Sequence, residues 1–405
     1  MEQAQVHHQL GAHTAGKPIR CRAAVARAAG EPLVIQDIIV QPPKEHEIRI
    51  RIVCTSLCHT DISFWKLKDP PACFPRIMGH EAVGIVESVG KSVDGLAAGD
   101  TVVPTCAAYC GECADCESEE SNLCSKLPFK LSPWMLREET SRFSDLNGEV
   151  LYHFMYVSSF SEYTVVDAAL VAKIDPSVPP NRACLLSCGV STGVGAAWRA
   201  AKVKAGSTVA IFGLGAVGLA VAEGARLCGA SKIIGIDINP DKFEIGKKFG
   251  ITDFINSGDC GNKSVSQVVK EMTSGGADYC FECVGMPSVM QQAYACCRKG
   301  WGKTVVIGAA HPGSQMTLDC LDLVSSGKIL TGSMLGDIKP KSDIPVLAKR
   351  YMDKELNLDD FVTHEIDFED INRAFDMLIS GSCIRCVIWI GKEEGRRNAP
   401  SAASE

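Results

Sequence analysis

Hydrophobic and polar residues follow two different periods in two parts of the chain. In residues 47–59, EIRIRIVCTSLCH, polar and apolar side chains alternate, and residues 81–90, EAVGIVESVG, repeat this pattern up to a glycine. A period of two is typical of β-strands. Proline pairs at 42–43, 70–71 and 179–180 punctuate this part, and no long amphipathic helix interrupts it. The first half is therefore predicted to be mainly β.

From about residue 190, buried strands alternate with helices. Residues 207–215, STVAIFGLG, predict a strand, and residues 216–229, AVGLAVAEGARLCG, predict a helix that ends at a glycine. Residues 232–237, KIIGID, predict the next strand, and Pro240 is expected to begin another helix in its favoured first-turn position. The same alternation continues through residues 265–273, 278–285, 288–297 and 303–310. This order predicts a parallel sheet with helices on both faces.

Composition and charge narrow the class of protein. The 405 residues are 46% hydrophobic and 22% charged, which favours a globular protein of two or three domains. The net charge of −7, without a Lys/Arg block, argues against a nucleic-acid or membrane-surface partner. Residues 1–16 lack the features of a signal peptide, and no run of apolar residues is long enough to span a membrane. A cytoplasmic location is therefore expected.

A glycine-rich segment suggests a dinucleotide site. The motif GLGAVG comprises Gly213, Leu214, Gly215, Ala216, Val217 and Gly218. Alone it is a weak signal, but here it follows a predicted strand and opens a predicted helix, as a pyrophosphate-binding turn does. Asp237 ends the next strand, where a carboxylate accepts from the adenosine ribose and repels a 2′-phosphate, so NAD is favoured over NADP. The alternative is a structural turn without a ligand.

Four of the twenty cysteines lie within fifteen residues of a polar segment. They are Cys110, Cys113, Cys116 and Cys124. Four thiolates without an open position suit a structural zinc ion. An iron–sulfur cluster uses similar spacing, whereas disulfides are disfavoured in a reducing compartment. Cys228, Cys296 and Cys297 lie in apolar segments and are predicted to fill the core.

Other candidate metal ligands are scattered along the sequence. CHTD supplies Cys58, His59, Thr60 and Asp61, GHE supplies His80 and Glu81, and LLSCGVSTG supplies Cys188. Spacing alone does not join these residues, and each could lie in the core or in a loop. Taken with FPRIMGHEAVGIVESVG, LSCGVSTGVGAAW and SCIRCVIWI, however, they carry a resemblance. Over residues 18–391 the chain resembles the zinc-dependent alcohol dehydrogenases of the medium-chain superfamily, especially their plant alcohol-dehydrogenase-like branch.

The resemblance implies an α/β fold with two kinds of domain. A mainly β, GroES-like catalytic domain would be joined to a Rossmann domain built on a doubly wound parallel sheet. The expected boundaries are 17–189 for the catalytic domain with a zinc lobe at 106–128, 190–332 for the NAD-binding domain, 333–393 for a return segment completing the catalytic domain, and 1–16 and 394–405 for disordered tails.

The resemblance also implies two zinc ions per chain, one structural in the cysteine lobe and one catalytic. Cys58, His80 and Cys188 would hold the catalytic zinc and leave one position open. Asp61 would orient His80, and Glu81 would sit behind the zinc and replace a ligand transiently. Zinc would lower the pKa of a bound alcohol.

Residues around the cofactor follow from the same resemblance. Thr60 would accept the alcohol proton and pass it toward the nicotinamide ribose, while hydride moves to NAD. The other implied NAD contacts are His59 and Arg385 at the pyrophosphate, Lys242 at the adenosine ribose, Thr192 beside the nicotinamide, and the backbone around Val284, Ile307 and Ala309 at the carboxamide. A homodimer joined through the cofactor-domain sheets is expected.

Two departures from the family pattern bear on the substrate. Ser63 stands where many members have a histidine that ends a proton relay, and Cys106 stands where many have an aromatic residue in the pocket. Phe154, Met155 and Tyr156 are expected to line the other side of that pocket. A thiol in place of a ring predicts a wider pocket, which favours bulky alcohols over ethanol.

Three functions compete for this sequence. The leading interpretation is a zinc oxidoreductase that interconverts a primary, allylic or secondary alcohol and its aldehyde or ketone with NAD. A non-redox hydroxynitrile lyase could use the same zinc and nucleotide motifs. A binding or structural protein that has lost activity, as in crystallin use of an enzyme fold, is the third.

Overall fold

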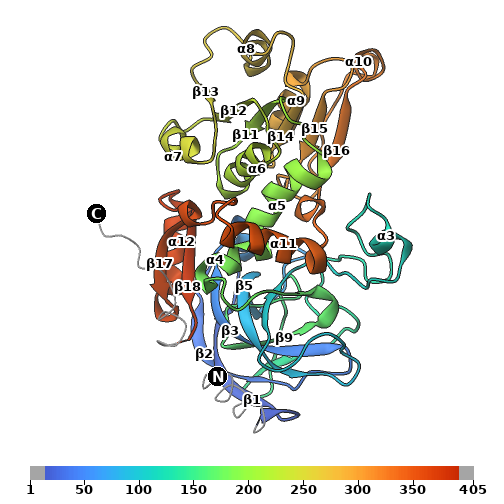
Figure 1. The fold of residues 1–405 in the computed structure, drawn as a ribbon. Coiled ribbons are helices and arrows are strands. Elements are labelled where there is room, and N and C mark those ends of the chain that lie inside the picture. Colours follow the sequence, from blue (N-terminus) through green and yellow to red (C-terminus); the bar gives the residue numbers. More distant parts are fainter. Residues whose placement is uncertain (1–13, 392–405) are drawn as a thin grey trace. The chain divides into compact units, whose positions relative to one another are not determined.

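The computed structural model describes residues 14–391, which form two compact units (Figure 1). Within the described residues, the first unit contains residues 14–188, Lys339–Asp353 and residues 361–391. The second unit contains Gly189–Ile338 and Lys354–Asp360. The tails predicted at 1–16 and 394–405 lie outside the described residues, apart from residues 14–16.

The first unit is built on two β-sheets, as the period-two pattern predicts. One has the strand order β4-β1-β2-β7-β8, and the other has the order β10-β6-β5-β3-β18-β17, with β9 also paired to β3. The strands are β1 Ile19–Ala26, β2 Val34–Val40, β3 Glu47–Ser56, β4 Arg76–Ile77, β5 Glu81–Val89, β6 Thr101–Pro104, β7 Phe143–Asp145, β8 Val150–Leu151, β9 Tyr163–Asp167, β10 Val171–Lys173, β17 Val362–Asp367 and β18 Arg385–Trp389. Only β17 and β18 pair in parallel among these described strands.

Strand β3 is more deeply buried than its alternating pattern suggests. It pairs with β5 on one side and β9 on the other. Arg49 occupies one of the polar positions of the alternating pattern, yet its side chain has no exposed surface. Its Nε donates to the carboxylate of Glu87 at 2.6 Å. Arg49 Nη2 also donates to the carbonyl of Thr14 at 2.8 Å, which fixes the start of the described chain. Ion pairing therefore allows the polar face of β3 to be buried.

The helices of the first unit are either short or lie in the C-terminal part of the sequence. They are α2 His59–Lys66, α3 Ala114–Glu117, α4 Pro180–Ala183, α11 Pro340–Met352 and α12 Ile371–Ile379. Helix α12 buries Ile371, Ala374, Phe375 and Leu378 in the core of the unit. Their spacing of three and four residues places all four on one helix face.

The second unit contains a six-stranded parallel sheet in the order β13-β12-β11-β14-β15-β16. The strands are β11 Thr208–Phe212, β12 Lys232–Asp237, β13 Asp253–Asn256, β14 Tyr279–Glu282, β15 Lys303–Val306 and β16 Ile329–Gly332. The helices are α5 Gly189–Gly195, α6 Ala216–Leu227, α7 Lys242–Lys248, α8 Val265–Met272, α9 Pro287–Cys296 and α10 Cys320–Ser326. The strand order reverses beside β11, so the predicted doubly wound α/β fold is confirmed.

Alternate residues of β11 face opposite helices. Ala210 and Phe212 pack with α8 and α9 in one hydrophobic cluster. Ile211, between them, approaches Gly218 of α6 on the other face. Cys296 and Cys297 are buried in the cluster with α8 and α9, as predicted for core-filling cysteines, whereas Cys228 after α6 is only partly buried and does not fill the core as predicted.

One predicted helix start is wrong. Helix α7 begins at Lys242, and Pro240 lies in the preceding turn, where its carbonyl accepts from Phe243 N at 3.0 Å. The side chains of Asp237 and Asn239 accept from backbone N–H groups two residues ahead, at 2.9 and 3.0 Å. These side-chain turns hold the backbone out of the helix until residue 242.

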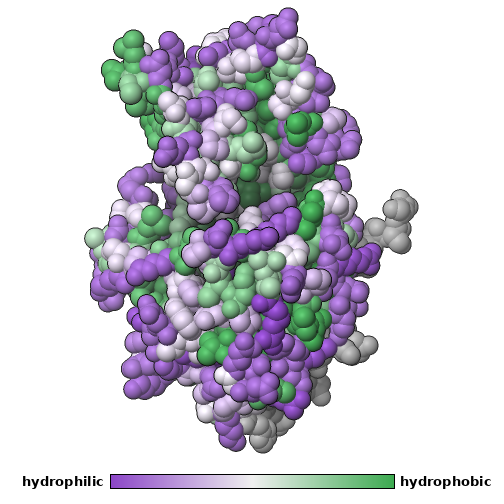
Figure 2. All heavy atoms as spheres, turned by 180° about the vertical axis from the view of Figure 1, so that it is seen from behind, coloured by the Kyte–Doolittle hydropathy of each residue, from purple (hydrophilic) through white to green (hydrophobic). Residues whose placement is uncertain are grey.

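The face in Figure 2 is polar over much of its area, with several hydrophobic groups, one of them where α10 lies. Leu321 and Val324 of this helix are 74% and 82% exposed. Ile329 on the neighbouring edge strand β16 is also exposed. No helix within residues 14–391 is both long and apolar enough to cross a membrane.

Candidate active site and cofactor sites

Three predicted metal ligands from distant parts of the sequence meet in the first unit. The donor atoms of Cys58, His80 and Cys188 all lie within 4.8 Å of one another. Strands β3 and β5 pair Ser56 with Glu81, which brings the following Cys58 next to the preceding His80. Ser187 Oγ lies 3.1 Å from the carbonyl of His80 and anchors the third segment. We call Cys58, His80 and Cys188 the three-donor cluster.

Asp61 holds two of the three donors in place. Its buried carboxylate accepts from Cys58 N at 3.0 Å and Gly79 N at 3.0 Å, and lies 3.2 Å from His80 Nδ1. An Nδ1–H bond to Asp61 leaves Nε2 of His80 with its lone pair free to bind a metal. That Nε2 is buried and has no hydrogen-bond partner among the described residues. The donor set therefore fits a zinc ion with a further position open.

Opposing pKa shifts mark the two thiols of the cluster. The hydrogen bond from Cys188, together with Arg385 and His80, lowers the pKa of Cys58 well below its usual value. The same hydrogen bond and burial raise the pKa of Cys188 well above it. Cys58 therefore favours the thiolate form that a metal ligand needs.

Glu81 and Arg385 form a buried ion pair beside the cluster. Arg385 Nε and Nη2 donate to the two carboxylate oxygens of Glu81, each at 3.0 Å. Nη2 also lies 3.7 Å from the sulfur of Cys58. Burial raises the pKa of Glu81, and Arg385 opposes this shift. Both Glu81 oxygens are thus engaged, and the roles expected for Glu81 at zinc and for Arg385 at pyrophosphate stay predictions.

Other expected site residues surround the cluster unevenly. The hydroxyl of Thr60 lies 3.8 Å from Cys58 Sγ, whereas Ser63 is exposed. Phe154 packs edge-on against His80 with ring centroids 5.6 Å apart. Burial raises the pKa of the Cys106 thiol, which keeps it neutral. Tyr156 packs with the cysteine lobe, and its hydroxyl donates to the carbonyl of Lys130 at 2.8 Å, so its place in the substrate pocket stays a prediction.

The four cysteines of the lobe also converge. All four sulfurs lie within 4.8 Å of one another, with 3.8 Å between Cys110 and Cys116 and 4.0 Å between Cys113 and Cys124. These separations are far longer than the disulfide bond of about 2.05 Å. A zinc ion with Zn–S bonds of about 2.3 Å requires tetrahedral edges of about 3.8 Å. An iron–sulfur cluster would spread the thiolates further, because irons and sulfides lie between them.

Backbone groups support the lobe sulfurs. Cys113 caps α3 and accepts from Cys116 N at 3.4 Å, while Cys124 accepts from Leu127 N at 3.3 Å. Hydrogen bonds from Ser125 and Cys116 lower the pKa of Cys113 to about 5. Lys339, at the start of α11, donates to the carbonyl of Cys116 at 2.6 Å and so secures the lobe to the rest of its unit.

The glycine motif in the second unit has the geometry that a pyrophosphate turn needs. Gly213 follows β11 with a φ of 89°, which favours glycine. A Cβ on Gly218 would lie 1.8 Å from the carbonyl oxygen of Gly213, so helix and turn pack only without a side chain there. At Gly215 the space where a Cβ would lie is open, and this residue caps α6. Ala216 and Val217 form the first turn of that helix.

Asp237 connects this turn to the end of β12. Its carboxylate accepts from Leu214 N at 2.7 Å and from Lys242 Nζ at 3.1 Å. The two residues expected at the adenosine ribose therefore lie together beside the glycine turn. Both belong to the second unit, as does Thr192 of α5.

A buried carboxylate missed in the sequence organises the next loops. Glu282 Oε1 accepts from Val284 N at 2.9 Å and Gly285 N at 2.8 Å, and the Glu282 carbonyl accepts from Ile307 N at 2.9 Å. A Cβ on Gly285 would clash with the carbonyl of Ala309 at 2.6 Å, so the segments expected at the nicotinamide carboxamide are adjacent. The segment FECVG gave no sign of this role, because an acidic residue after a buried strand has many uses.

The fold, the two clusters of candidate metal donors and the glycine turn together define a class of protein, and family profiles agree. The alcohol dehydrogenase GroES-like domain matches residues 44–176, and the zinc-binding dehydrogenase domain matches residues 216–353. The chain belongs to the zinc-dependent alcohol dehydrogenases of the medium-chain superfamily and is an NAD-dependent enzyme of this family. The family cofactors, zinc and NAD, are those predicted from the sequence.

Individual relatives place the chain in the plant branch. It is 65% identical over 376 residues to alcohol dehydrogenase-like 7 of Arabidopsis thaliana, covering 93% of this chain and 96% of that protein. Among solved structures, an alcohol dehydrogenase zinc-binding domain protein from Burkholderia ambifaria matches with a TM-score of 0.85 and 33% identity, over 93% of this chain and all of that one. Benzyl alcohol dehydrogenase from Acinetobacter calcoaceticus matches with a TM-score of 0.81 and 31% identity, over 92% and 100%.

Proposed function

We propose that the three-donor cluster holds a catalytic zinc, that the lobe holds a structural zinc, and that the enzyme interconverts a bulky primary, allylic or secondary alcohol with its carbonyl compound. The observation that carries this proposal is the pair of hydrogen bonds that the Asp61 carboxylate accepts, from Cys58 N and from His80 Nδ1. They orient Cys58 and His80 toward one point and leave the buried Nε2 of His80 as a metal donor. A cluster of three donors rather than four leaves room for a substrate oxygen.

The chain's own residues supply positioning and proton transfer. When bound, zinc supplies Lewis-acid polarisation of the substrate oxygen. Thr60, in the first turn of α2 beside Cys58, holds the alcohol proton at Oγ1 in this proposal. Ser63 does not titrate near neutral pH, so this side chain would not take up the proton that Thr60 holds. When bound, NAD would supply the hydride acceptor for the carbinol carbon.

Substrate size follows from the residues around the cluster. Cys106 is smaller than an aromatic side chain, and Phe154 supplies an apolar ring next to His80. A large substrate would bury more apolar surface in a wide apolar pocket, and each Å² buried contributes about 25 cal/mol to the binding free energy. The structural relative named for benzyl alcohol acts on a bulky primary alcohol, which supports the same expectation for this chain.

One experiment separates the redox reaction from cyanohydrin cleavage. Purified enzyme is supplied with NAD and a panel of alcohols while NADH absorbance and carbonyl product are measured, and a parallel assay measures cyanide release from cyanohydrins. The proposal expects one NADH per carbonyl product with at least one alcohol. Cyanide release with bound NAD unchanged, and no alcohol oxidised across the panel, would instead establish a hydroxynitrile lyase.

A variant tests the role of Thr60 within the redox reaction. Thr60→Ala removes the hydroxyl that holds the proton, so kcat should fall by about a hundred-fold while KM changes little. Thr60→Ser keeps a hydroxyl and should retain most of the activity. Equal activity of the alanine and serine variants would remove Thr60 from the proton path.

Assembly and location complete the proposal. A homodimer formed through the edge strand β16 is supported by the exposed Leu321, Val324 and Ile329 on and beside that edge. Sedimentation of the purified enzyme tests the dimer. The cytoplasmic location stays a prediction, which imaging of a tagged chain tests.

A further inference from the structure

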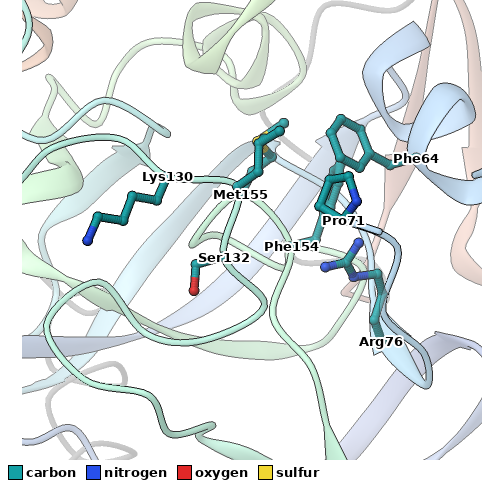
Figure 3. Close-up of a pocket in the computed structure, with 8 residues that line it drawn as sticks. Phe64, Pro71, Arg76, Lys130, Ser132, Phe154 and Met155 are labelled. Carbon is teal, nitrogen blue, oxygen red and sulfur yellow. The ribbon is translucent and has the colours of Figure 1, made fainter. Parts of the chain in front are cut away.

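Residues expected on the two sides of the reaction lie in different units. Phe154 and Met155, which are expected beside the substrate, line a small pocket of the first unit (Figure 3). The glycine turn and the loops after β14 and β15, which are expected at the cofactor, belong to the second unit. Within that unit one buried residue, Glu282, holds both of these loops.

The carboxylate of Glu282 shapes the loop that follows β14. Glu282 is the last residue of this strand and has no exposed surface. Its Oε1 accepts from the backbone N of Val284 at 2.9 Å and of Gly285 at 2.8 Å. Gly285 has a φ of 86°, which favours glycine, and the chain turns there over the carboxylate. A side chain rather than a neighbouring strand therefore satisfies these two backbone donors.

The main chain of Glu282 holds the loop that follows β15. Its carbonyl oxygen accepts from Ile307 N at 2.9 Å and from Gly308 N at 3.0 Å. A Cβ on Gly285 would lie 2.6 Å from the carbonyl oxygen of Ala309, and a Cβ on Gly308 would lie 2.6 Å from Glu282 Oε2. The two loops therefore pack directly on each other and on Glu282, which sets the conformation of both.

The order of the strands places these loops away from the residues expected at the adenosine. The central strands follow the order β12-β11-β14-β15. Asp237, expected at the adenosine ribose, ends β12, and the glycine turn expected at the pyrophosphate follows β11. A dinucleotide in a doubly wound fold lies across the carboxyl ends of the strands where their order reverses. Its nicotinamide half would therefore reach the ends of β14 and β15.

The two oxygens of the Glu282 carboxylate have different surroundings. Oε2 is buried and has no hydrogen-bond partner among the described residues, whereas Oε1 accepts both loop hydrogen bonds. Burial raises the pKa of Glu282, and backbone N–H groups of Gly285, Val284 and Met286 oppose this shift. An uncharged amide oxygen in the position of Oε1 would accept the same hydrogen bonds. The position of the acceptor is therefore expected to matter more than its charge.

We propose that Glu282 is a positioning residue for the nicotinamide half of NAD, acting through the conformation of residues 283–286 and 307–309. This inference rests on the proposed alcohol–carbonyl reaction and extends it to the cofactor side. Glu282 has no exposed surface, so it acts through the two loops rather than by touching the cofactor. Hydride transfer depends strongly on such placement, since a misplacement of about 1 Å costs about 100-fold in rate.

The test compares two ligands without turnover. Calorimetry measures the affinity of NADH and of ADP-ribose, which lacks the nicotinamide, for the wild type, Glu282→Ala and Glu282→Gln. Glu282→Ala leaves two backbone donors unsatisfied, so it should weaken NADH binding by about ten-fold and change ADP-ribose binding by less than about two-fold. Glu282→Gln keeps the acceptor and should bind both ligands as the wild type does. Equal weakening of both ligands, or no weakening of either in Glu282→Ala, would overturn the proposal.

A third variant separates the position of the acceptor from its charge. Glu282→Asp keeps the charge but withdraws the carboxylate by one methylene, so it should lose NADH affinity as Glu282→Ala does. With saturating NAD, kcat should fall by about 100-fold in the alanine and aspartate variants, while KM for the alcohol changes little. Full function of Glu282→Asp together with loss in Glu282→Gln would show that charge acts instead, and the proposed role would be wrong.

Glu223 provides a matched control in the same unit. It lies in α6, has no exposed surface and accepts from the backbone N of Asn357 at 2.8 Å. Glu223→Ala should lower the melting temperature, yet leave the ratio of NADH to ADP-ribose affinity unchanged. A ratio that shifts equally in Glu223→Ala and Glu282→Ala would mean that loss of any buried carboxylate has this effect, which refutes the proposal.

Binding of ADP-ribose also reports whether each variant is folded. If Glu282→Ala does not fold, the comparison of Glu282→Gln with Glu282→Asp decides, because both keep a polar side chain at this position. Normal turnover and an unchanged affinity ratio in Glu282→Asp would then refute the positioning role alone. Absence of NADH formation with every alcohol in the wild type would refute the proposed reaction, while the affinity ratio still reports on Glu282.

Discussion

The cysteine lobe and the three-donor cluster use the same sulfur donors in opposite settings. In the lobe, residues 110–124 supply every donor, and backbone N–H groups of Cys116 and Leu127 support the sulfurs. In the cluster, donors from three distant segments are surrounded by the charged side chains of Asp61, Glu81 and Arg385.

This difference indicates what each site has to do. Backbone N–H groups do not titrate or change rotamer, so they suit an ion that is only held. Charged side chains create an electrostatic field around the donors. Such a field can stabilise the charge that develops on a reacting group in the transition state, which is what a catalytic site needs. We therefore expect changes in the lobe to act on stability and changes in the cluster to act on turnover.

The strongest test of this division replaces a donor of the cluster. Cys58→Ser should leave one zinc per chain and lower turnover by about a thousand-fold or more, because Lewis-acid polarisation is lost. Metal analysis and NADH formation measure both effects. Cys54→Ala, which removes a buried thiol outside the cluster, should keep two zinc ions. A Cys58→Ser enzyme with two zinc ions and full turnover would remove this residue from the site.

The matched change in the lobe should act mainly on stability. Cys113→Ser opens the four-thiolate site and should lower the melting temperature by roughly 5 °C or more, with one zinc lost. Thermal unfolding and metal analysis measure the change, and the exposed Cys320→Ser serves as the control. An unchanged melting temperature together with a thousand-fold loss of turnover would reverse the assignment of the two sites.

A change in the support of the cluster should have a smaller effect. Asp61→Asn keeps the shape but removes the charge that orients His80, so metal affinity at this site should fall by about 10- to 100-fold. Chelator competition measures this loss while the lobe keeps its zinc. Equal retention of both ions would show that the bond at 3.2 Å between Asp61 and His80 does not tune the metal.

The smallest expected effect concerns substrate choice beside the cluster. Cys106→Phe fills space, and each buried methylene contact is worth about 0.8 kcal/mol, so preference should shift toward small alcohols by about four-fold per methylene. The kcat/KM ratio of ethanol to a bulky allylic alcohol measures the shift. A ratio that does not move would place Cys106 outside the substrate pocket.

Local sequence patterns predicted much of this fold. Alternation in residues 47–59 predicted β3, and the strand–helix order from residue 207 predicted the parallel sheet, because period follows directly from backbone geometry. The start of α7 was predicted wrongly, because side-chain turns at Asp237 and Asn239 compete with the helix. The burial of Arg49 depends on Glu87 in another strand, which no local pattern reveals.

The candidate sites divide in the same way. All residues of the lobe lie within one short segment, and so do those of the glycine turn. The spacing of the cysteines and of the glycines was therefore enough to suggest a metal ion and a dinucleotide. Bringing Cys58, His80 and Cys188 together required the family resemblance, because their proximity depends on the pairing of β3 with β5 and on Ser187. Glu282 was missed, since the backbone N–H groups that its carboxylate accepts from come into place only in the folded loops.

The spacing of the donors along the chain also sets an order of assembly. The lobe closes over fifteen residues, whereas the three-donor cluster needs everything from Cys58 to Cys188. Closing the longer loop costs roughly 2 kcal/mol more in chain entropy. In the proposed assignment, the lobe would take up its ion once Cys124 has left the ribosome. The ion proposed for the three-donor cluster would bind only after Cys188 has emerged and the β-sheet has formed. A nascent chain in a metal-poor cell would therefore be stabilised before it becomes active.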